Sequence, residues 1–137
     1  MGPRSGMGAP ANTPATQGAS RYYRVAGETG THTGYLWSAS GTLLGCVSFS
    51  GETSSGWQSA NFSAPIAITP HTTYVASVNS NTTLAYTASS LSSSVSNGAR
   101  ATVADGQNGV YSSTAGSFPT LSNNSANYFR DVFFQPQ

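Results

Sequence analysis

The segment from Gly30 to Phe62 constrains the fold more than any other part of the chain. It reads GTHTGYLWSASGTLLGCVSFSGETSSGWQSANF, and it alternates short apolar runs with Gly, Ser and Thr turns. Apolar runs bounded by turn residues are typical of β-strands joined by tight loops. No stretch of the chain repeats apolar residues at the helical period of 3.6. We therefore expect an all-β fold.

The same pattern continues along the chain and predicts a two-layered architecture. Strands are expected at 21–25, 34–38, 42–50, 55–62, 65–68, 72–78, 110–113 and 127–134, with weaker signals at 83–87 and 99–109. Strands of this length and spacing predict an antiparallel β-sandwich of about eight or nine short strands, jelly-roll or immunoglobulin-like. A closed barrel is the competing architecture.

Chain length and local composition predict one domain preceded by a tail. A chain of 137 residues fits a single domain. Residues 1–20, MGPRSGMGAPANTPATQGAS, are rich in Gly, Pro, Ala and Thr and show no period. Such a composition indicates a flexible linker or a segment bound to a partner. We assign 1–20 to this tail and 21–137 to the sandwich domain.

Charge is scarce, and this excludes several classes of function. Only 7% of residues are charged, with five Arg, no Lys and a net charge of +1. Binding to nucleic acid needs a basic stripe that displaces counterions, and the sequence has none. It also has no apolar run long enough to span a membrane. A surface built from Ser, Thr, Asn and Gly indicates a secreted or cell-surface protein.

A single cysteine, Cys46, excludes an intrachain disulfide. It lies within the strand-like run TLLGCVSFS. We expect it to be a small buried hydrophobic residue rather than a reactive thiol.

Several short motifs in combination resemble one bacterial family. They are YYRVAGETGTHTGYLW, SGTLL, SGWQ, PIAIT, TTYVAS, ADGQNGVY and FPT, spread from Arg21 to Phe134. The family they resemble is a secreted β-sandwich domain of unknown function, found beside glycoside hydrolase, fibronectin-like and immunoglobulin-like modules in extracellular multidomain proteins. The resemblance implies a sandwich and an extracellular setting, and it brings no catalytic residues.

The chain departs from that family before Arg21. Members usually have an apolar strand there, whereas this chain has GMGAPANTPATQGAS, a poor strand former. A missing strand would leave an open sheet edge that pairs with another chain.

No pattern in the sequence indicates catalysis or a resident cofactor. Glycoside hydrolysis needs two carboxylates at a set separation, and serine hydrolysis needs a nucleophile elbow. Neither pattern is evident, so we expect a non-catalytic protein without a cofactor. His32, Glu28 and Asp105 lie in predicted loops and are the candidates for Ca²⁺ should those loops converge. Isolated polar loop residues usually face water.

Aromatic side chains are the candidate binding groups. Sugars stack on exposed aromatic faces flanked by amide and hydroxyl groups. We expect an extracellular accessory module that binds polysaccharide or a cell-surface glycan. The candidate ligand-binding residues are Trp57, Tyr35, Trp37 and Tyr111, with Tyr22 and Tyr128 as further platforms, and Trp57 and Tyr35 should be the most exposed.

A second hypothesis belongs to a different class of function. Low charge weakens repulsion between copies of the chain. The alternative is therefore a structural subunit of a self-assembling extracellular filament or surface layer, completed by strand or tail exchange. The partners expected are thus polysaccharide or other copies of this chain.

Overall fold

The computed structural model describes residues 4–7, 15–97 and 100–136 and is all-β in these ranges. Three of its eleven strands have only two residues, so eight longer strands form the frame. The predicted fold class is confirmed. No helix in the described ranges is long and apolar enough to cross a membrane. The strands are β1 (Arg4–Met7), β2 (Ala15–Arg24), β3 (Thr33–Ser38), β4 (Leu43–Ser48), β5 (Gly56–Ile68), β6 (Thr72–Val78), β7 (Ser96–Asn97), β8 (Arg100–Thr102), β9 (Val110–Tyr111), β10 (Leu121–Ser122) and β11 (Arg130–Pro136).

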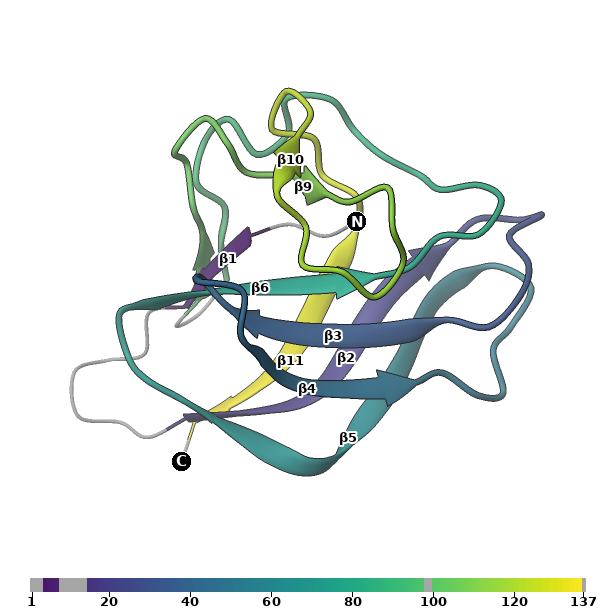
Figure 1. Cartoon of the computed structure of the whole chain (residues 1–137), viewed down its shortest axis with the longest axis horizontal. Helices are drawn as coiled ribbons and strands as arrows, with labels where there is room; N and C mark the ends of the chain where they lie inside the picture. Colours follow the sequence, from purple (N-terminus) through teal and green to yellow (C-terminus); the bar gives the residue numbers. More distant parts are fainter. Residues whose placement is uncertain (1–3, 8–14, 98–99, 137) are drawn as a thin grey trace.

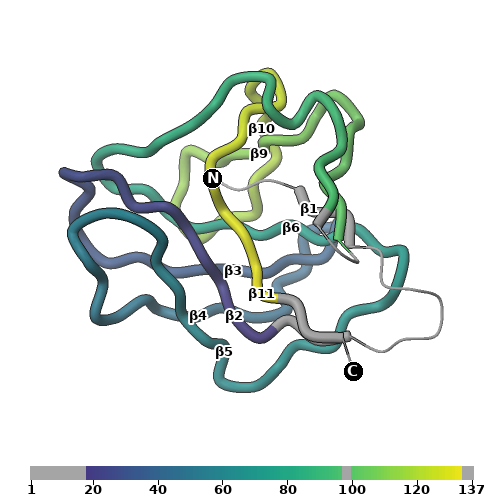
Figure 2. Tube along the Cα trace, turned by 180° about the vertical axis from the view of Figure 1, so that it is seen from behind, coloured from purple at the N-terminus to yellow at the C-terminus, as the bar shows by residue number. Residues whose placement is uncertain are grey.

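Two antiparallel sheets stack to form the sandwich. The larger has the order β4-β3-β6-β1-β8-β7, and the smaller has the order β11-β2-β5. The smaller sheet lies behind β3, β4 and β6 in Figure 1 and faces the viewer in Figure 2. A third, two-stranded sheet, β10-β9, lies above the larger one in Figure 1.

The main core fills the space between the two large sheets. Leu36 from β3, Phe62 from β5 and Val132 from β11 meet in one cluster of buried side chains. Tyr22 and Val78 extend this core in a second cluster. Side chains alternate between the two faces of a strand, so the neighbours of these residues in β2, β5 and β11 point outward from the sandwich.

Strands β3 and β6 are covered on both faces. Trp37 and Val75 turn away from the main core and pack against Val110, Tyr35 and Phe118. The chain around β9 and β10 thus forms a partial third layer over the larger sheet. This cover explains why five consecutive residues at the end of β6 are buried, where a sandwich exposed on its outer face would alternate.

The N-terminal segment enters the sheets. We expected residues 1–20 to be a tail, but β1 lies between β6 and β8, and β2 begins at Ala15. The strand that the sequence seemed to lack is therefore supplied by β1 of the same chain. The boundary placed at residue 21 falls inside β2. The parts of the expected tail at 1–3 and 8–14 lie outside the described residues.

Two edge strands differ from expectation. Cys46 is exposed, not buried, because it points outward from β4, the edge strand of the larger sheet. Leu43 is also exposed, and a register shift between Leu36 and Trp37 interrupts the pairing of β3 with β4. The expected strands at 55–62 and 65–68 form one strand, β5, which passes through Pro65. An edge strand tolerates proline because one side needs no ladder hydrogen bonds.

Candidate functional site

The outer face of the smaller sheet carries a group of aromatic side chains. Tyr22 is 1% exposed whereas its neighbour Tyr23 is 38% exposed, and Trp57 and Phe133 are 48% and 53% exposed. Exposed large aromatics gathered on one sheet face are uncommon on a soluble domain and often mark a binding surface. We call this surface the Trp57 face; it comprises Arg21, Tyr23, Trp57, Phe129, Asp131 and Phe133.

Strand pairing brings these residues together from distant parts of the sequence. Tyr23 of β2 lies directly opposite Trp57 of β5, and their rings meet edge to face with centroids 5.8 Å apart. Arg21 lies opposite Asp131 of β11. Its guanidinium carbon is 5.0 Å from the centroid of the Trp57 ring and 5.7 Å from that of Phe133. Contacts of this kind hold the arginine by cation–π attraction.

Phe129 enters the face through a rare backbone conformation. Its φ is 54°, a left-handed value that bulky residues seldom adopt. The conformation is held by two hydrogen bonds. The Phe129 amide donates to Asn127 Oδ1 at 2.8 Å, and the Phe129 carbonyl accepts from the Tyr23 amide at 3.0 Å. The Phe129 ring then lies 6.4 Å from Tyr23, so the strained residue extends the aromatic surface.

A hollow of about 240 Å³ opens beside Trp57. It lies between the start of β5, the start of β11 and strand β8. Its walls combine aromatic and aliphatic groups with a guanidinium, a carboxylate and an amide, the mixture usual for small-molecule sites. The lining residues that matter most here are Trp57, Arg100, Thr102, Asn127, Phe129, Arg130 and Asp131.

One ion pair lies at the wall of this hollow. Arg100 Nη1 is 3.1 Å from Asp131 Oδ1, and the two side chains are 20% and 39% exposed. Arg100 also donates to the main-chain carbonyl of Val132. The pair ties β8 of the larger sheet to β11 of the smaller one, and it leaves polar groups facing solvent at the hollow.

The other predicted aromatic residues lie elsewhere. Trp37 is 6% exposed and donates its indole N–H to Ser77 Oγ at 2.9 Å. Tyr35 is half-buried, stacks on Trp37 with ring centroids 5.6 Å apart, and lines a smaller hollow of about 150 Å³ among hydroxyl side chains of 112–117. Tyr111 is half-buried in β9, paired with Leu121. The four residues thus do not converge on one site, and only Trp57 belongs to the Trp57 face.

The two further candidate platforms are internal. Tyr22 and Tyr128 are 1% and 3% exposed. Burial raises the pKa of the Tyr128 hydroxyl above its usual value. Neither ring is available as a sugar platform.

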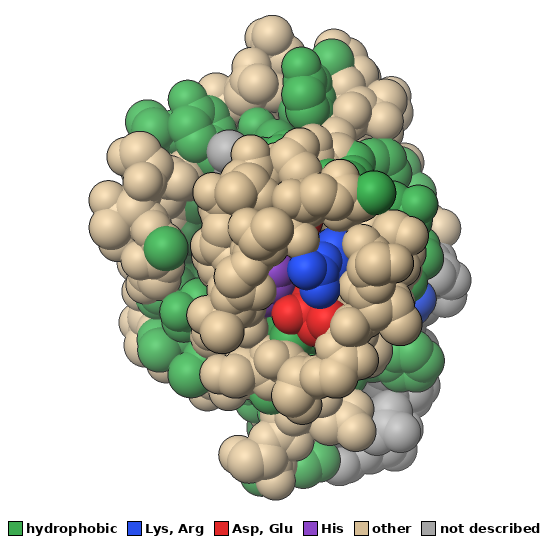
Figure 3. All heavy atoms as spheres, turned by 90° about the vertical axis from the view of Figure 1, so that its right-hand side faces the viewer, with side chains coloured by type: hydrophobic (Ala, Val, Ile, Leu, Met, Phe, Trp, Pro, Cys, Tyr) green, Lys and Arg blue, Asp and Glu red, His purple; other side chains and the backbone are tan. Residues whose placement is uncertain are grey.

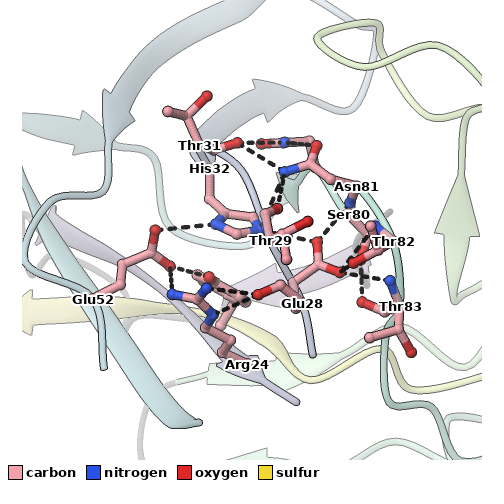
Figure 4. Close-up of polar contacts among 12 residues, drawn as sticks. Arg24, Glu28, Thr29, Thr31, His32, Glu52, Ser80, Asn81, Thr82 and Thr83 are labelled. Carbon is pink, nitrogen blue, oxygen red and sulfur yellow. Dashed lines mark hydrogen bonds and ion pairs between the residues drawn. The ribbon is translucent and has the colours of Figure 1, made fainter. Parts of the chain in front are cut away.

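Four of the chain's eleven Arg, His, Asp and Glu residues gather at one end of the sandwich. Figure 3 shows basic, acidic and histidine side chains side by side, surrounded mainly by backbone and uncharged side chains. Figure 4 shows their arrangement: Glu28 and Glu52 lie on either side of His32, and Arg24 lies below. We call this group, with the loop Asn81–Thr83, the His32 cluster.

His32 is fully buried and lies between two carboxylates. Its Nε2 is 3.0 Å from Glu28 Oε1, and its Nδ1 is 3.0 Å from Glu52 Oε2. A neutral imidazole has one N–H, so only the doubly protonated ring donates to both carboxylates. Glu52 also accepts a hydrogen bond from the Tyr22 hydroxyl, whose pKa burial and this bond raise above its usual value.

Glu28 has no acceptor capacity left. Its Oε1 accepts the Asn81 amide at 2.6 Å as well as facing His32, and its Oε2 accepts the Thr82 and Thr83 amides at 3.0 and 2.6 Å. Burial alone would raise the pKa of Glu28. The hydrogen bonds from Asn81, His32, Thr83 and Thr82 outweigh it and lower this pKa to about 2. The carboxylate therefore stays ionised and holds the loop Asn81–Thr83 in place.

Arg24 and Arg130 complete the charge balance around the cluster. Arg24 Nη2 donates to the main-chain carbonyl of Glu28 at 2.6 Å and lies 3.8 Å from Glu52 through Nη1. Arg130 is 4% exposed, and its guanidinium lies 5.3 Å from the Tyr22 ring centroid. Burial lowers the pKa of Arg130 to about 10, against the opposing effect of Tyr22 and Glu28, so it remains a cation at neutral pH.

The candidate metal residues are divided between two places. Glu28 and His32 meet, but each ring nitrogen of His32 faces a different carboxylate, so the groups do not point at a common centre. Asp105 accepts the amide of Gln107 in the loop between β8 and β9. Within the described ranges, no three His, Cys, Asp or Glu side chains could hold a metal ion. The hydrogen bonds and ion pairs of the His32 cluster instead hold three loops together.

Sequence reasoning missed most of the Trp57 face. Of its six members, only Trp57 was among the candidates, and Arg21, Tyr23 and Phe133 were not. The signal was present in the alternation of RYYR and RDVFF, which places Arg21 with Tyr23 and Asp131 with Phe133. Register between β11, β2 and β5 was needed to bring the three strands together.

The fold and this surface define a β-sandwich domain with an aromatic outer face. The chain belongs to the family described as Domain of unknown function (DUF4082), whose model matches residues 6–130. No characterised protein and no solved structure is detectably similar to it.

Proposed function

We propose that this chain is a non-catalytic extracellular accessory module that binds polysaccharide through the Trp57 face. One observation carries the proposal. Trp57 is 48% exposed and borders a hollow that also contains a guanidinium, a carboxylate and an amide. A ligand that covers this ring and removes it from water needs an apolar face and polar edges, and a sugar ring has both.

The chemistry of the hollow supports a sugar ligand. The C–H groups of a pyranose can pack on Trp57, while its hydroxyl groups meet donors and acceptors around the rim. Arg100 offers N–H donors, Asp131 offers carboxylate oxygens, and Asn127 and Thr102 line the same hollow. A few polar groups at fixed positions beside an aromatic surface are what orients a ligand in a binding site.

The extent of the face supports a polymer rather than a single sugar. The rings of Tyr23 in β2 and Phe133 in β11 continue the surface beyond the hollow, whose wall includes Phe129. An open sheet face gives room for several consecutive sugar units. The low charge and the abundance of Ser, Thr and Asn support an extracellular location.

The environment of the carboxylates supports a role without catalysis. Glu28 and Glu52 are engaged in the His32 cluster, where the Glu28 oxygens have no room for a further donor. Asp131 is paired with Arg100. Glycoside hydrolysis would need two carboxyl groups flanking one bond, with one of them able to donate a proton.

Affinity electrophoresis in gels containing xylan, cellulose derivatives, chitin derivatives or polygalacturonate tests the proposal. We expect retardation by at least one polymer, and loss of that retardation in Trp57→Ala. Tyr86→Ala is the matched control, since Tyr86 is 58% exposed and lies outside the Trp57 face. No retardation by any polymer, or equal retardation of wild type and Trp57→Ala, would contradict the proposal.

The position of β1 favours a second candidate function, self-assembly by strand exchange. β1 has four residues and is paired on one side with β6 and on the other with β8. When so short an interior strand detaches, it leaves a gap between β6 and β8, and the equivalent strand of another copy can pair there. We expect a chain lacking residues 1–7 to bind a synthetic peptide of that sequence. A strictly monomeric full-length chain at millimolar concentration would argue against assembly.

A further inference from the structure

We propose that the polysaccharide bound by the Trp57 face is anionic, and that Arg21 pairs with the carboxylate or sulfate group of the sugar. This inference rests on the proposed function and names the class of glycan. It is argued from the distribution of charge on the chain and from the geometry of Arg21.

Basic side chains are few, and they gather at this face. Of the five arginines, Arg24 is bound in the His32 cluster, and the side chain of Arg4 lies outside the described set. The other three, Arg21, Arg100 and Arg130, all lie at the Trp57 face or its hollow. The chain has no lysine. A local excess of positive charge on an otherwise nearly neutral surface attracts an anionic ligand.

Arg21 is held by aromatic rings, and among the described side chains no carboxylate forms an ion pair with it. Its guanidinium lies near the Trp57 and Phe133 rings, at 5.0 and 5.7 Å from their centroids. Among the side chains that the structure describes, the ion pairs of arginine involve Arg24 and Arg100, and none involves Arg21. A guanidinium held against rings keeps its in-plane N–H groups available, and their fork matches a carboxylate or a sulfate.

The hollow itself has a positive balance. Arg100 and Arg130 both line it, and Asp131 is the one carboxylate among its lining residues. Arg130 donates through Nη1 to the Tyr128 carbonyl, while its buried Nε donates to none of the described groups. Arg130 is almost fully buried and interacts with Glu28 of the His32 cluster, so the accessible charges here are two cations, Arg21 and Arg100, and one anion, Asp131. An acidic sugar compensates this excess of positive charge, whereas a neutral sugar leaves it uncompensated.

Comparison of acidic and neutral polymers tests the inference on the full chain. The probes are polygalacturonate, dextran sulfate and neutral xylan, measured by affinity electrophoresis and by calorimetry with oligosaccharides. We expect an acidic polymer to bind more tightly than xylan, with an affinity that falls as NaCl is raised. Arg21-dependent binding to polygalacturonate assigns a carboxylate as the ligand group, and Arg21-dependent binding to dextran sulfate assigns a sulfate.

Variants of Arg21 separate specific pairing from net charge. Arg21→Gln should weaken binding of the acidic polymer by about tenfold or more. Arg21→Lys should weaken it less, because lysine keeps the positive charge although it loses the paired N–H donors of the guanidinium. Ser113→Asp is the matched control. It lowers net charge by the same amount at an exposed position on the loop after β9 and should bind like wild type. Circular dichroism confirms that each variant is folded.

The outcomes distinguish this inference from the proposed function. Equal binding of xylan and the acidic polymers, without a salt effect, overturns the inference and leaves polysaccharide binding in place. Acidic-polymer binding that Ser113→Asp weakens as much as Arg21→Gln also overturns it. No binding to any polysaccharide overturns both.

Discussion

Replacing Glu28 by Gln should destabilise the fold by roughly 3 kcal/mol at neutral pH. The pKa of Glu28 is about 2 instead of 4.5, and a tenfold change in proton affinity corresponds to about 1.4 kcal/mol. The ionised carboxylate therefore stabilises the native state by roughly 3 kcal/mol more than the protonated carboxyl group would. The amide of Gln has the same shape, but its NH₂ group would face main-chain donors of Asn81–Thr83. An unmade hydrogen bond to a buried donor costs about 1–3 kcal/mol, which agrees in size.

The pH dependence gives the prediction its sign. The folded-state pKa of Glu28 lies below the unfolded value, so its contribution is complete above about pH 4.5 and is lost as pH falls toward 2. Wild type should therefore lose more stability than Glu28→Gln between pH 5 and about pH 2, and the two proteins should converge at the acid end. Urea unfolding, followed by tryptophan fluorescence at several pH values, measures both effects.

A matched carboxyl-to-amide change tests whether the effect belongs to the cluster. Asp105→Asn alters an exposed loop carboxylate whose contact with the Gln107 amide an asparagine oxygen can keep. We expect it to change the free energy of unfolding by less than about 1 kcal/mol. The reasoning is refuted if Glu28→Gln costs no more than Asp105→Asn at pH 7, or if its stability still falls with acid as steeply as that of wild type.

Three further predictions follow from burial and backbone geometry. Trp37→Ala should destabilise the domain by about 3–5 kcal/mol in urea unfolding, because the ring is buried under the β9 layer; an effect below about 1 kcal/mol would contradict that cover. Cys46 should react with a maleimide in the native protein, since its side chain is exposed; labelling that requires denaturant would show it buried. Gly109→Ala should severely destabilise or unfold the domain, because φ is +74° and a Cβ would meet the Ala126 carbonyl oxygen at 2.2 Å; a native-like Tm would refute this.

The fold class could be predicted because it depends on local patterns. Turn residues and short apolar runs from Gly30 to Phe62 correspond to β3, β4 and the first half of β5. The predicted range 72–78 is the observed β6. The expected strand at 127–134 overlaps β11, in which Val132 is buried and Phe133 exposed. These features require no knowledge of which strands pair.

The positions of residues that depend on long-range packing could not be predicted. β1 is a strand because β6 and β8 pair with it on both sides, and its Gly-containing sequence gives no local signal. Trp37 is buried because the distant segment around Val110 covers it. Glu28 and Glu52 lie in two loops that are separated in the sequence by β3 and β4, and only the folded chain brings both to His32.

The Trp57 face could be predicted only in part, because most of its residues are brought together by long-range strand pairing. An aromatic residue just after Gly56 at the start of a strand indicated exposure, and Trp57 is exposed. Its partners come from β2 and β11, which are distant in sequence and adjacent only in the sheet. Without the register, Arg21, Tyr23 and Phe133 could not be placed beside Trp57.

Mapping a bound oligosaccharide by NMR tests the central claim most directly. The ¹⁵N-labelled chain is titrated with oligosaccharides from whichever polymer retards it in gels, or with oligogalacturonate and xylo-oligosaccharides in turn. The account predicts that the Trp57 indole N–H and the amides of Tyr23, Phe129 and Asp131 shift together and saturate. Shifts confined to the hydroxyl-lined hollow beside Tyr35, or no shifts with any oligosaccharide, would contradict it.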